Sequence, residues 1–361
     1  MIPLVDLKKQ YATIKDEIKK EFDEVLDKQS FILGDKVKQF EREFANIHES
    51  KYCLGCSSGT SALKLALRAC GVGLGDEVIT VPNTFIATIE PILELGAKPV
   101  FVDVRPDTYL MNTDLIKDKI TSKTKAIIPV HLYGQMCEMD IIRSIADEHK
   151  LFVIEDAAQA HLAKYNGHYP GFYSDVACFS FFPGKNLGCY GDAGAVLTND
   201  EDLRYKMLTS RDHGRKPGEK YKHDYFGTNE RMDELQASVL LVKMRYIQNW
   251  TKQRKELAKK YLNFLDEKRF VLPYVNKFAE PVWHLFVVQL IDGNRDTYLE
   301  MLKNNGVGAG IHYPIPLHLQ PALSCLGLIK GSFPIAEQLS EKIISLPLFP
   351  ELDFNEVKEV L

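Results

Sequence analysis

Two segments near the middle of the chain carry residue types that could act together in catalysis. The apolar run LFVIEDA holds Glu155 and Asp156 at its end, and open α/β sheets bind their ligands beyond the carboxyl ends of such strands. Lys185 follows in SFFPGKNLG, directly after the aromatic, proline and glycine residues 181–184. These neighbours would desolvate the ammonium and lower its pKa, which suits a lysine that forms a Schiff base. No other lysine has such a setting, so Lys185 is the predicted nucleophile.

A third segment, SSGTS at residues 57–61, precedes an apolar stretch with helical spacing. The free N–H groups of a first helical turn and the hydroxyls of Thr60 and Ser61 would suit one phosphate. Taken alone, these residues are explained better by ordinary N-capping. Together with Asp156 and Lys185, however, they complete the three parts of a pyridoxal 5'-phosphate site. These parts are an anchor for the phosphate, an amine for the aldehyde and a carboxylate for the ring nitrogen.

Four motifs, in order along nearly the whole chain, resemble the DegT/DnrJ/EryC1/StrS family of sugar aminotransferases. These are pyridoxal phosphate enzymes of the aspartate-aminotransferase-like group, fold type I. The motifs are EDAAQAH, SFFPGKNLG-x-YGDAGAV, GTNERMDELQAS and GIHYPIPLHLQPA. The resemblance implies that Lys185 holds the cofactor as an imine and that Asp156 is the partner of the ring nitrogen, both as catalytic residues. Phe182 departs from the family, because many relatives have a tyrosine whose hydroxyl is sometimes available to the substrate.

The same resemblance assigns further residues to the cofactor. Gln159 would lie against the ring or its phenolic oxygen, although locally it could cap a helix. Phe85 would stack on the other face of the ring, although it could equally be a core residue. The phosphate would be held by Thr60, Ser61 and Ser180.

Some residues would come from a second subunit. The resemblance implies that Asn229 reaches the phosphate from the neighbouring chain, whereas its position after Gly227 is also typical of a turn. His312 and Tyr313 would reach the substrate on a loop of the partner chain, and the alternative is a structural histidine in a connecting segment. A homodimer with shared active sites is therefore expected.

The resemblance also implies a two-stage amino transfer. Glutamate would leave its amine as pyridoxamine 5'-phosphate and depart as 2-oxoglutarate. The keto group of a nucleoside-diphosphate-linked keto-deoxysugar would then accept the amine. The motif GIHYPIPLHLQPA favours amination at C3, with C4 as the alternative. Relatives that remove a hydroxyl group have histidine in place of the lysine, so Lys185 favours transamination over a pyridoxal-phosphate-dependent dehydratase or lyase.

A non-enzymatic regulatory protein is the second alternative. Its support is a run of seven basic residues between positions 243 and 260. A solvated helix face is the simpler explanation of such a run, and no helix-turn-helix pattern accompanies it.

The catalytic segments require a scaffold of alternating strands and helices. Helical spacing predicts an amphipathic helix over residues 11–26. From residue 58 onward, near-continuous apolar strands alternate with helices, which is typical of a mostly parallel sheet sandwiched by helices. The predicted strands are 78–81, 99–104, 126–132 and 151–157, followed by two short runs after residue 175 and a later strand at 282–290. The predicted helices are 61–70, 86–95, a polar helix after residue 104, another helix before residue 151, and a long helix over 232–265.

These elements predict an α/β protein with the PLP-transferase (aspartate aminotransferase-like) fold. Residues 1–245 would form a large pyridoxal-phosphate-binding domain that includes the N-terminal helix. Residues 246–361 would form a smaller C-terminal α/β domain. The longest stretch without charged residues, 304–329, contains three prolines and is interpreted as a buried or cleft-lining loop, not a membrane helix.

Composition restricts the partners and the compartment. The 361 residues include 45 Lys+Arg and 49 Asp+Glu, and the resulting formal net charge of −4 argues against a dedicated nucleic-acid binder. The charged N-terminal segment is unlike an export signal. Seven cysteines, an odd number, indicate reduced thiols and a cytoplasmic protein. Cys53 and Cys56 have no second pair to complete a zinc site, so no metal is predicted.

Overall fold

The central feature of the computed structural model, which describes residues 1–361, is a seven-stranded sheet in the order β1-β8-β7-β5-β4-β2-β3. Only β8 runs against the others, because it pairs antiparallel with both β1 and β7. The remaining neighbours pair in parallel, which confirms the predicted mostly parallel sheet. The strands are β1 (Tyr52–Cys56), β2 (Glu77–Thr80), β3 (Lys98–Phe101), β4 (Thr124–Ile127), β5 (Phe152–Asp156), β7 (Val176–Ser180) and β8 (Gly194–Thr198).

Each predicted strand of the large sheet is present, most of them with shorter bounds, while the strand predicted over 78–81 is shifted by one residue to Glu77–Thr80. The strand predicted over 126–132 ends at Ile127, because Pro129 has no N–H with which to continue the ladder. Val130 still forms an isolated parallel bridge with Asp156. The end of β5 and the segment after β4 therefore remain side by side, and both reach the edge where ligands are expected.

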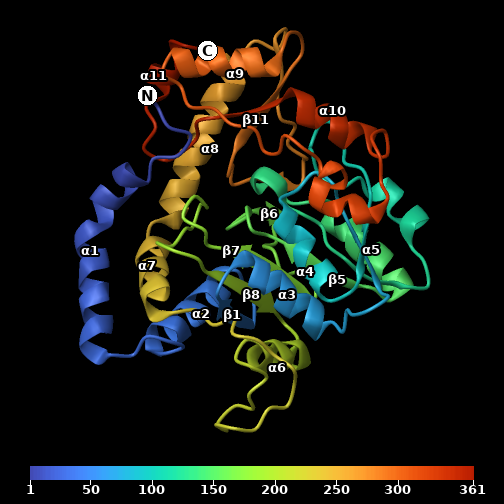
Figure 1. Ribbon diagram of the computed structural model, residues 1–361. Helices are drawn as coiled ribbons and strands as arrows, with labels where there is room; N and C mark the ends of the chain where they lie inside the picture. Colours follow the sequence, from blue (N-terminus) through green and yellow to red (C-terminus); the bar gives the residue numbers. More distant parts are fainter.

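Helices cover the sheet (Figure 1). The N-terminal helix is longer than predicted, and the polar helix expected after residue 104 is replaced by two short 3-10 turns, Thr113–Leu115 and Lys117–Lys119. The segment expected as a helix over 86–95 is a 3-10 turn, Ile86–Thr88, and a short α-helix. The helices are α1 (Leu7–Lys28), α2 (Asp35–Ile47), α3 (Gly59–Ala69), α4 (Glu90–Glu94), α5 (Met139–His149), α6 (Glu201–Ser210), α7 (Glu234–Met244) and α8 (Ile247–Phe264).

The long helix predicted over 232–265 is two helices. The break between α7 and α8 separates two helices that differ in how much of their surface is buried. Helix α7 is buried along most of its length, whereas α8 buries one face and exposes the other. The apolar periodicity continues through the break, so the sequence pattern did not reveal it.

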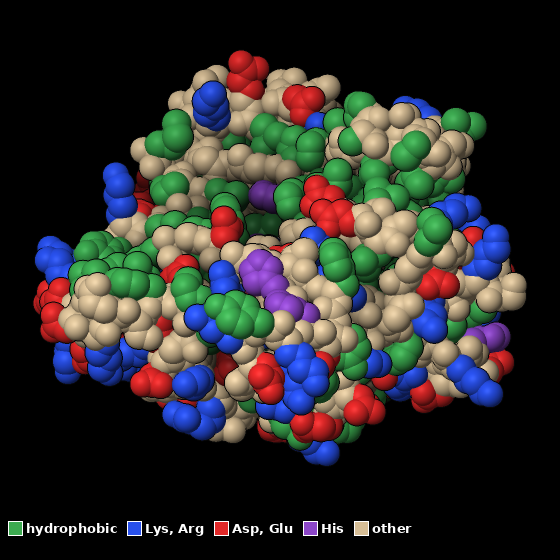
Figure 2. Space-filling view, turned by 60° about the horizontal axis from the view of Figure 1, so that its bottom comes forward, with side chains coloured by type: hydrophobic (Ala, Val, Ile, Leu, Met, Phe, Trp, Pro, Cys, Tyr) green, Lys and Arg blue, Asp and Glu red, His purple; other side chains and the backbone are tan.

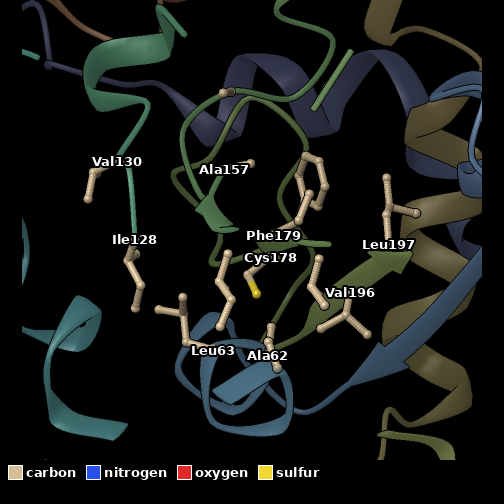
Figure 3. Packing of buried hydrophobic residues seen from close by; sticks show 14 of the residues in the cluster. Ala62, Leu63, Ile128, Val130, Ala157, Cys178, Phe179, Val196 and Leu197 are labelled. Atoms are coloured by element: carbon tan, nitrogen blue, oxygen red, sulfur yellow. The ribbon is translucent and has the colours of Figure 1, made fainter. Parts of the chain in front are cut away.

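Helix α3 is held firmly against the sheet. Ala62 and Leu63 lie beside Cys178 of β7 and Val196 of β8 in the apolar layer (Figure 3). The start of this helix comes close to the end of β7, since a Cβ at Gly59 would lie 2.7 Å from the Cβ of Ser180. Apolar packing thus fixes the helix N-terminus beside the carboxyl ends of the central strands.

The C-terminal part has a smaller sheet and its own apolar core. The core holds 18 buried residues, and the sheet order is β12-β11-β9. The strand predicted over 282–290 begins only at Phe286, because the N–H groups of Val282 and His284 bind carbonyls of residues 134 and 133. The elements are β9 (Phe270–Val271), β11 (Phe286–Leu290), α9 (Arg295–Asn304), α10 (Pro334–Lys342), β12 (Ile343–Leu346) and α11 (Phe354–Lys358), and a separate two-stranded pair joins β6 (Lys164–Tyr165) and β10 (Ala279–Glu280).

The boundary at residue 245 stays a prediction. It coincides with the break between α7 and α8, and Figure 1 shows α8 leading to the C-terminal part. However, Trp250, Leu285 and Phe333 pack in the large core of 80 buried residues. The N-terminus also joins the C-terminal part, where Ile2 forms a bridge with Val307.

The basic run between residues 243 and 260 is not one exposed surface. Lys243 and Arg254 are buried, and the Arg254 guanidinium donates to three backbone carbonyls. On the face shown in Figure 2, Lys and Arg side chains are interspersed with Asp and Glu. The helices include none that is both long enough and apolar enough to cross a membrane.

Candidate active site

A cavity of about 460 Å³ lies at the carboxyl ends of β5 and β7. Its walls come from segments far apart in the chain, including the N-terminal residues Leu4 and Val5 and the start of α3. Most of the predicted site residues line it: Thr60, Phe85, Asp156, Gln159, Ser180, Lys185, His312 and Tyr313. We call this space the cavity.

The two adjacent carboxylates of β5 have different environments. Successive side chains of a strand point to opposite faces, and only Asp156 lines the cavity. Its Oδ2 accepts a hydrogen bond from Thr88 Oγ1 at 2.8 Å and its Oδ1 accepts one from the Ala158 N–H at 3.2 Å. Glu155 is fully buried and binds His131 Nε2 at 2.6 Å and the Gly171 N–H at 2.7 Å. Asp156 is therefore the carboxylate that a ligand can reach.

The Lys185 side chain enters the cavity and its amine makes no hydrogen bond within the chain. Burial lowers its pKa to about 8, and the Coulomb attraction of Asp156 opposes part of this shift. The expectation that no other lysine is desolvated was wrong. Burial also lowers the pKa of Lys243 to about 8, but that side chain lies outside the cavity and its Nζ donates to the Gly188 carbonyl at 2.6 Å. Sequence neighbours alone could not reveal Lys243, because tertiary packing buries it.

The start of α3 presents backbone N–H groups to the cavity. Ser58 is the N-cap and accepts a hydrogen bond from the Ser61 N–H, while Gly59 and Thr60 line the cavity. The expected role of the Ser61 hydroxyl needs correction. That hydroxyl binds Ser57 Oγ at 2.8 Å and the carboxylate of Glu230, and Ser61 does not line the cavity.

Gln159 and Phe85 both line the cavity, and both lie near Tyr313. Gln159 is buried, accepts a hydrogen bond from the Tyr133 N–H at 2.6 Å and donates one to the Tyr313 hydroxyl at 3.3 Å. Phe85 is not a core residue, because 55% of it is exposed while it lines the cavity. Its ring centroid lies 5.8 Å from that of Tyr313. An exposed phenyl ring in a cavity is free to stack on a bound ring.

The expectation that the loop of His312 and Tyr313 serves a partner chain was wrong. Both residues line the cavity that contains Lys185 of the same chain, and the hydrogen bond to Gln159 places Tyr313 there. His312 Nδ1 lies 2.8 Å from Ser345 Oγ of β12. The C-terminal sheet thus folds this loop back over its own site, which the linear sequence could not show.

Asn229 does not line the cavity of its own chain. Its Oδ1 accepts a hydrogen bond from Arg231 Nε at 3.0 Å, on the segment that follows α6. The role that the resemblance gave it, at the site of a neighbouring subunit, stays a prediction.

The residues that sequence reasoning missed either contact predicted ones or line the same cavity. Thr88 donates a hydrogen bond to Asp156, Ser58 caps α3, and His284 lines the cavity. Thr84 lies 2.8 Å from the Thr88 hydroxyl and extends the contact to Asp156. Threonines and single histidines have no distinctive spacing, so only the fold brings them to the site.

The residues of the cavity fit pyridoxal phosphate. A phosphate can lie at the start of α3, where Gly59 lacks the Cβ that would press against Ser180. An unbonded, desolvated amine and a fixed carboxylate line the same space, as the aldehyde and the ring nitrogen require.

Known proteins support this assignment. The sequence model of the DegT/DnrJ/EryC1/StrS aminotransferase family matches residues 12–361. A protein of Geobacillus stearothermophilus named pleiotropic regulatory protein is 46% identical over 97% of this chain and 94% of its own length. The dTDP-3-amino-3,6-dideoxy-alpha-D-galactopyranose transaminase of Aneurinibacillus thermoaerophilus is 43% identical over 100% of this chain and 98% of its own length.

The fold has a matching experimental structure. The crystal structure of S. venezuelae DesV in complex with a ketimine intermediate has a TM-score of 0.96 and 40% identity, covering 99% of this chain and 96% of that chain. The predicted fold class and cofactor are thereby confirmed. From the family match, these relatives and the geometry of the cavity, we conclude that the chain belongs to the DegT/DnrJ/EryC1/StrS aminotransferase family and is a pyridoxal-phosphate-dependent aminotransferase.

Proposed function

We propose that the enzyme moves an amino group from glutamate to the C3 keto group of a nucleoside-diphosphate-linked keto-deoxysugar. The observation that carries the proposal is the cavity itself, in which the free amine of Lys185 and the fixed carboxylate of Asp156 share one space. The name of the Aneurinibacillus relative, a 3-amino-sugar transaminase, supports C3 over C4. The choice of glutamate rests on the family resemblance.

Each of the cavity residues would have its own role in the reaction. Bound pyridoxal phosphate supplies an electron sink for the carbon next to the nitrogen. Asp156, held by Thr88, would keep the ring nitrogen protonated. In each half-reaction the Lys185 amine would carry the proton between the substrate carbon and the cofactor carbon, and its lowered pKa makes it a usable base near neutral pH. Phe85 would stack on one face of the ring, and Gln159 would lie against the ring or its phenolic oxygen.

We further propose a cytoplasmic homodimer in which Asn229 completes the partner's phosphate site. Seven free cysteines, six of them buried, support a reducing compartment. The aromatic residues Tyr221 and Phe226, near Asn229, are 82% and 81% exposed, which is typical of surfaces that become covered on association.

The regulatory alternative has one point in its favour, the name of the Geobacillus relative. The buried Lys243 and Arg254 weaken the basic helix on which it would depend. A gel-shift titration at rising salt is the direct test, and binding that persists at moderate salt with sequence preference would favour this alternative.

The proposed reaction is tested by adding glutamate and a nucleotide-linked 3-keto or 4-keto deoxysugar to the holoenzyme. We expect 2-oxoglutarate and a 3-amino sugar, with the position of the nitrogen established by NMR of the product. A 4-amino product would correct the position. A deoxygenated sugar without 2-oxoglutarate would instead identify a dehydratase.

A further inference from the structure

His284 is a histidine of the cavity to which the family resemblance assigned no role. It precedes β11 and is only 8% exposed. Its N–H donates to the Tyr133 carbonyl at 2.9 Å, and its own carbonyl accepts from Arg254 Nη1 at 3.2 Å. The backbone is therefore fixed from both sides, and the imidazole has a defined position.

The side chain of Asn186 determines which imidazole nitrogen carries the proton. Asn186 Nδ2 donates to the Val282 carbonyl at 3.0 Å, so its Oδ1 is the atom that lies 3.2 Å from His284 Nδ1. An amide oxygen only accepts hydrogen bonds, and Nδ1 must therefore be the donor. Burial, with the nearby charge of Lys185, holds the pKa of His284 well below its ordinary value. The ring is consequently neutral, and Nε2 carries a lone pair.

This lone pair is available to a ligand. Nε2 has no hydrogen-bond partner in the chain, and it is not fully buried, so it is accessible. Because His284 lines the cavity, we take this accessible atom to face it. The Lys185 amine makes no hydrogen bond to it, and the pKa of Lys185 responds to burial and Asp156 instead. The chain thus places a fixed, neutral acceptor in the same cavity as the reactive amine.

The chemistry of an acceptor selects between the two substrates of the proposed reaction. The carboxylates of glutamate offer only acceptors, which a lone pair would repel, and the one donor group of glutamate is the amine that it transfers. A sugar ring offers hydroxyl donors. We propose that His284 Nε2 accepts a hydrogen bond from a hydroxyl of the nucleotide-linked sugar, and so acts as a specificity residue for the acceptor substrate. This inference rests on the proposed function.

Two substitutions separate the nitrogens of this imidazole. His284→Asn places an amide near the Nδ1 position, so it can retain the contact with Asn186 while it removes the acceptor at Nε2. His284→Gln places an amide oxygen near the Nε2 position and retains the acceptor. In single-turnover measurements we expect His284→Asn to weaken sugar binding about tenfold or more and to leave the glutamate half-reaction within about twofold of wild type. His284→Gln should recover much of the sugar affinity.

A substrate lacking one ring hydroxyl sharpens the test. Loss of the hydroxyl that contacts His284 should weaken binding to wild type but make little further difference to His284→Asn. Equal slowing of both half-reactions in His284→Asn, or an equal further loss with every deoxy analogue, would overturn the inference. Failure of wild type to aminate any keto sugar would overturn the proposed function instead, so the two failures are distinguishable.

A measurement on the wild-type protein tests the inference without depending on whether the variants fold. With ¹⁵N-labelled histidine, the Nε2 resonance of His284 should move when the holoenzyme binds the aminated nucleotide sugar, and should not move with 2-oxoglutarate. The opposite pattern, or no response to the sugar at saturation, would contradict the assignment.

Discussion

At the scale of single residues, the cavity contains a lysine whose basicity the fold has changed. Burial lowers the pKa of Lys185 from 10.5 to about 8 and Asp156 limits the shift. Only the neutral amine attacks an aldehyde, and the amine is neutral above its pKa. Uptake of pyridoxal phosphate by the apoenzyme should therefore rise with pH and level off above about pH 8. Stopped-flow absorbance at a series of pH values checks this, and a rate still rising towards pH 10 would contradict it.

Basicity alone does not identify the nucleophile, because Lys243 has a similarly lowered pKa. The position of the amine identifies the nucleophile, since the Lys243 amine donates a hydrogen bond to the Gly188 carbonyl outside the cavity. We expect borohydride reduction of the holoenzyme to fix the cofactor to Lys185 and to leave Lys243 unmodified. Peptide mapping by mass spectrometry reads the result directly, and label on Lys243 or Lys164 would refute the assignment.

The carboxylate of Asp156 is expected to matter for chemistry more than for binding. Asp156→Asn should retain cofactor but lose amino transfer about 100-fold or more, because a preorganised charge is removed from a buried site. Single-turnover rates with glutamate measure the loss. Glu155→Gln is the informative comparison, because the Glu155 side chain does not itself line the cavity and its loss should chiefly lower the melting temperature. Near wild-type turnover of Asp156→Asn would make Asp156 structural.

At the scale of elements, the close approach of α3 to β7 shapes the phosphate site. A Cβ at Gly59 would meet the Cβ of Ser180 at 2.7 Å, so Gly59→Ala should shift the helix start and weaken cofactor affinity about tenfold. Gly73→Ala is the matched control, because a Cβ there has no neighbour within 4 Å. Fluorescence titration of both apoenzymes gives the dissociation constants. Equal affinities would mean that the start of α3 does not hold the phosphate.

The strands and helices also show which features the sequence could predict and which it could not. The alternation of apolar strands and helices was sufficient to predict the parallel sheet, and the end of β5 was sufficient to make Glu155 and Asp156 candidates, between which the family resemblance chose Asp156. The break between α7 and α8 was missed because apolar periodicity runs through it. Contacts between distant segments, such as Thr88 with Asp156 or the return of Tyr313 to Gln159, leave no local pattern.

At the scale of the whole molecule, one chain supplies nearly the complete site. The cavity contains Lys185, Asp156 and, against expectation, His312 and Tyr313 from the same chain. Ser61 and Asn229 are the predicted residues that remain outside it, and of the two only Asn229 was expected to serve a partner. A two-fold contact uses the same surface on both subunits, so if a residue of one subunit enters the partner's site, the same residue of the partner enters the site of the first subunit. Sharing between subunits therefore depends on Asn229 alone among the predicted residues.

Mixing two inactive variants tests this sharing. Lys185→Ala lacks the amine, and Asn229→Asp adds a carboxylate that should repel the cofactor phosphate. If Asn229 serves the partner, a mixed dimer has one site with both lesions and one with neither. Random exchange should then restore about a quarter of wild-type activity, because half of the dimers are mixed and each has one intact site. If Asn229 serves its own chain, both sites of every mixed dimer carry a lesion. Subunit exchange confirmed by native mass spectrometry, with no activity recovered, would therefore exclude the shared site.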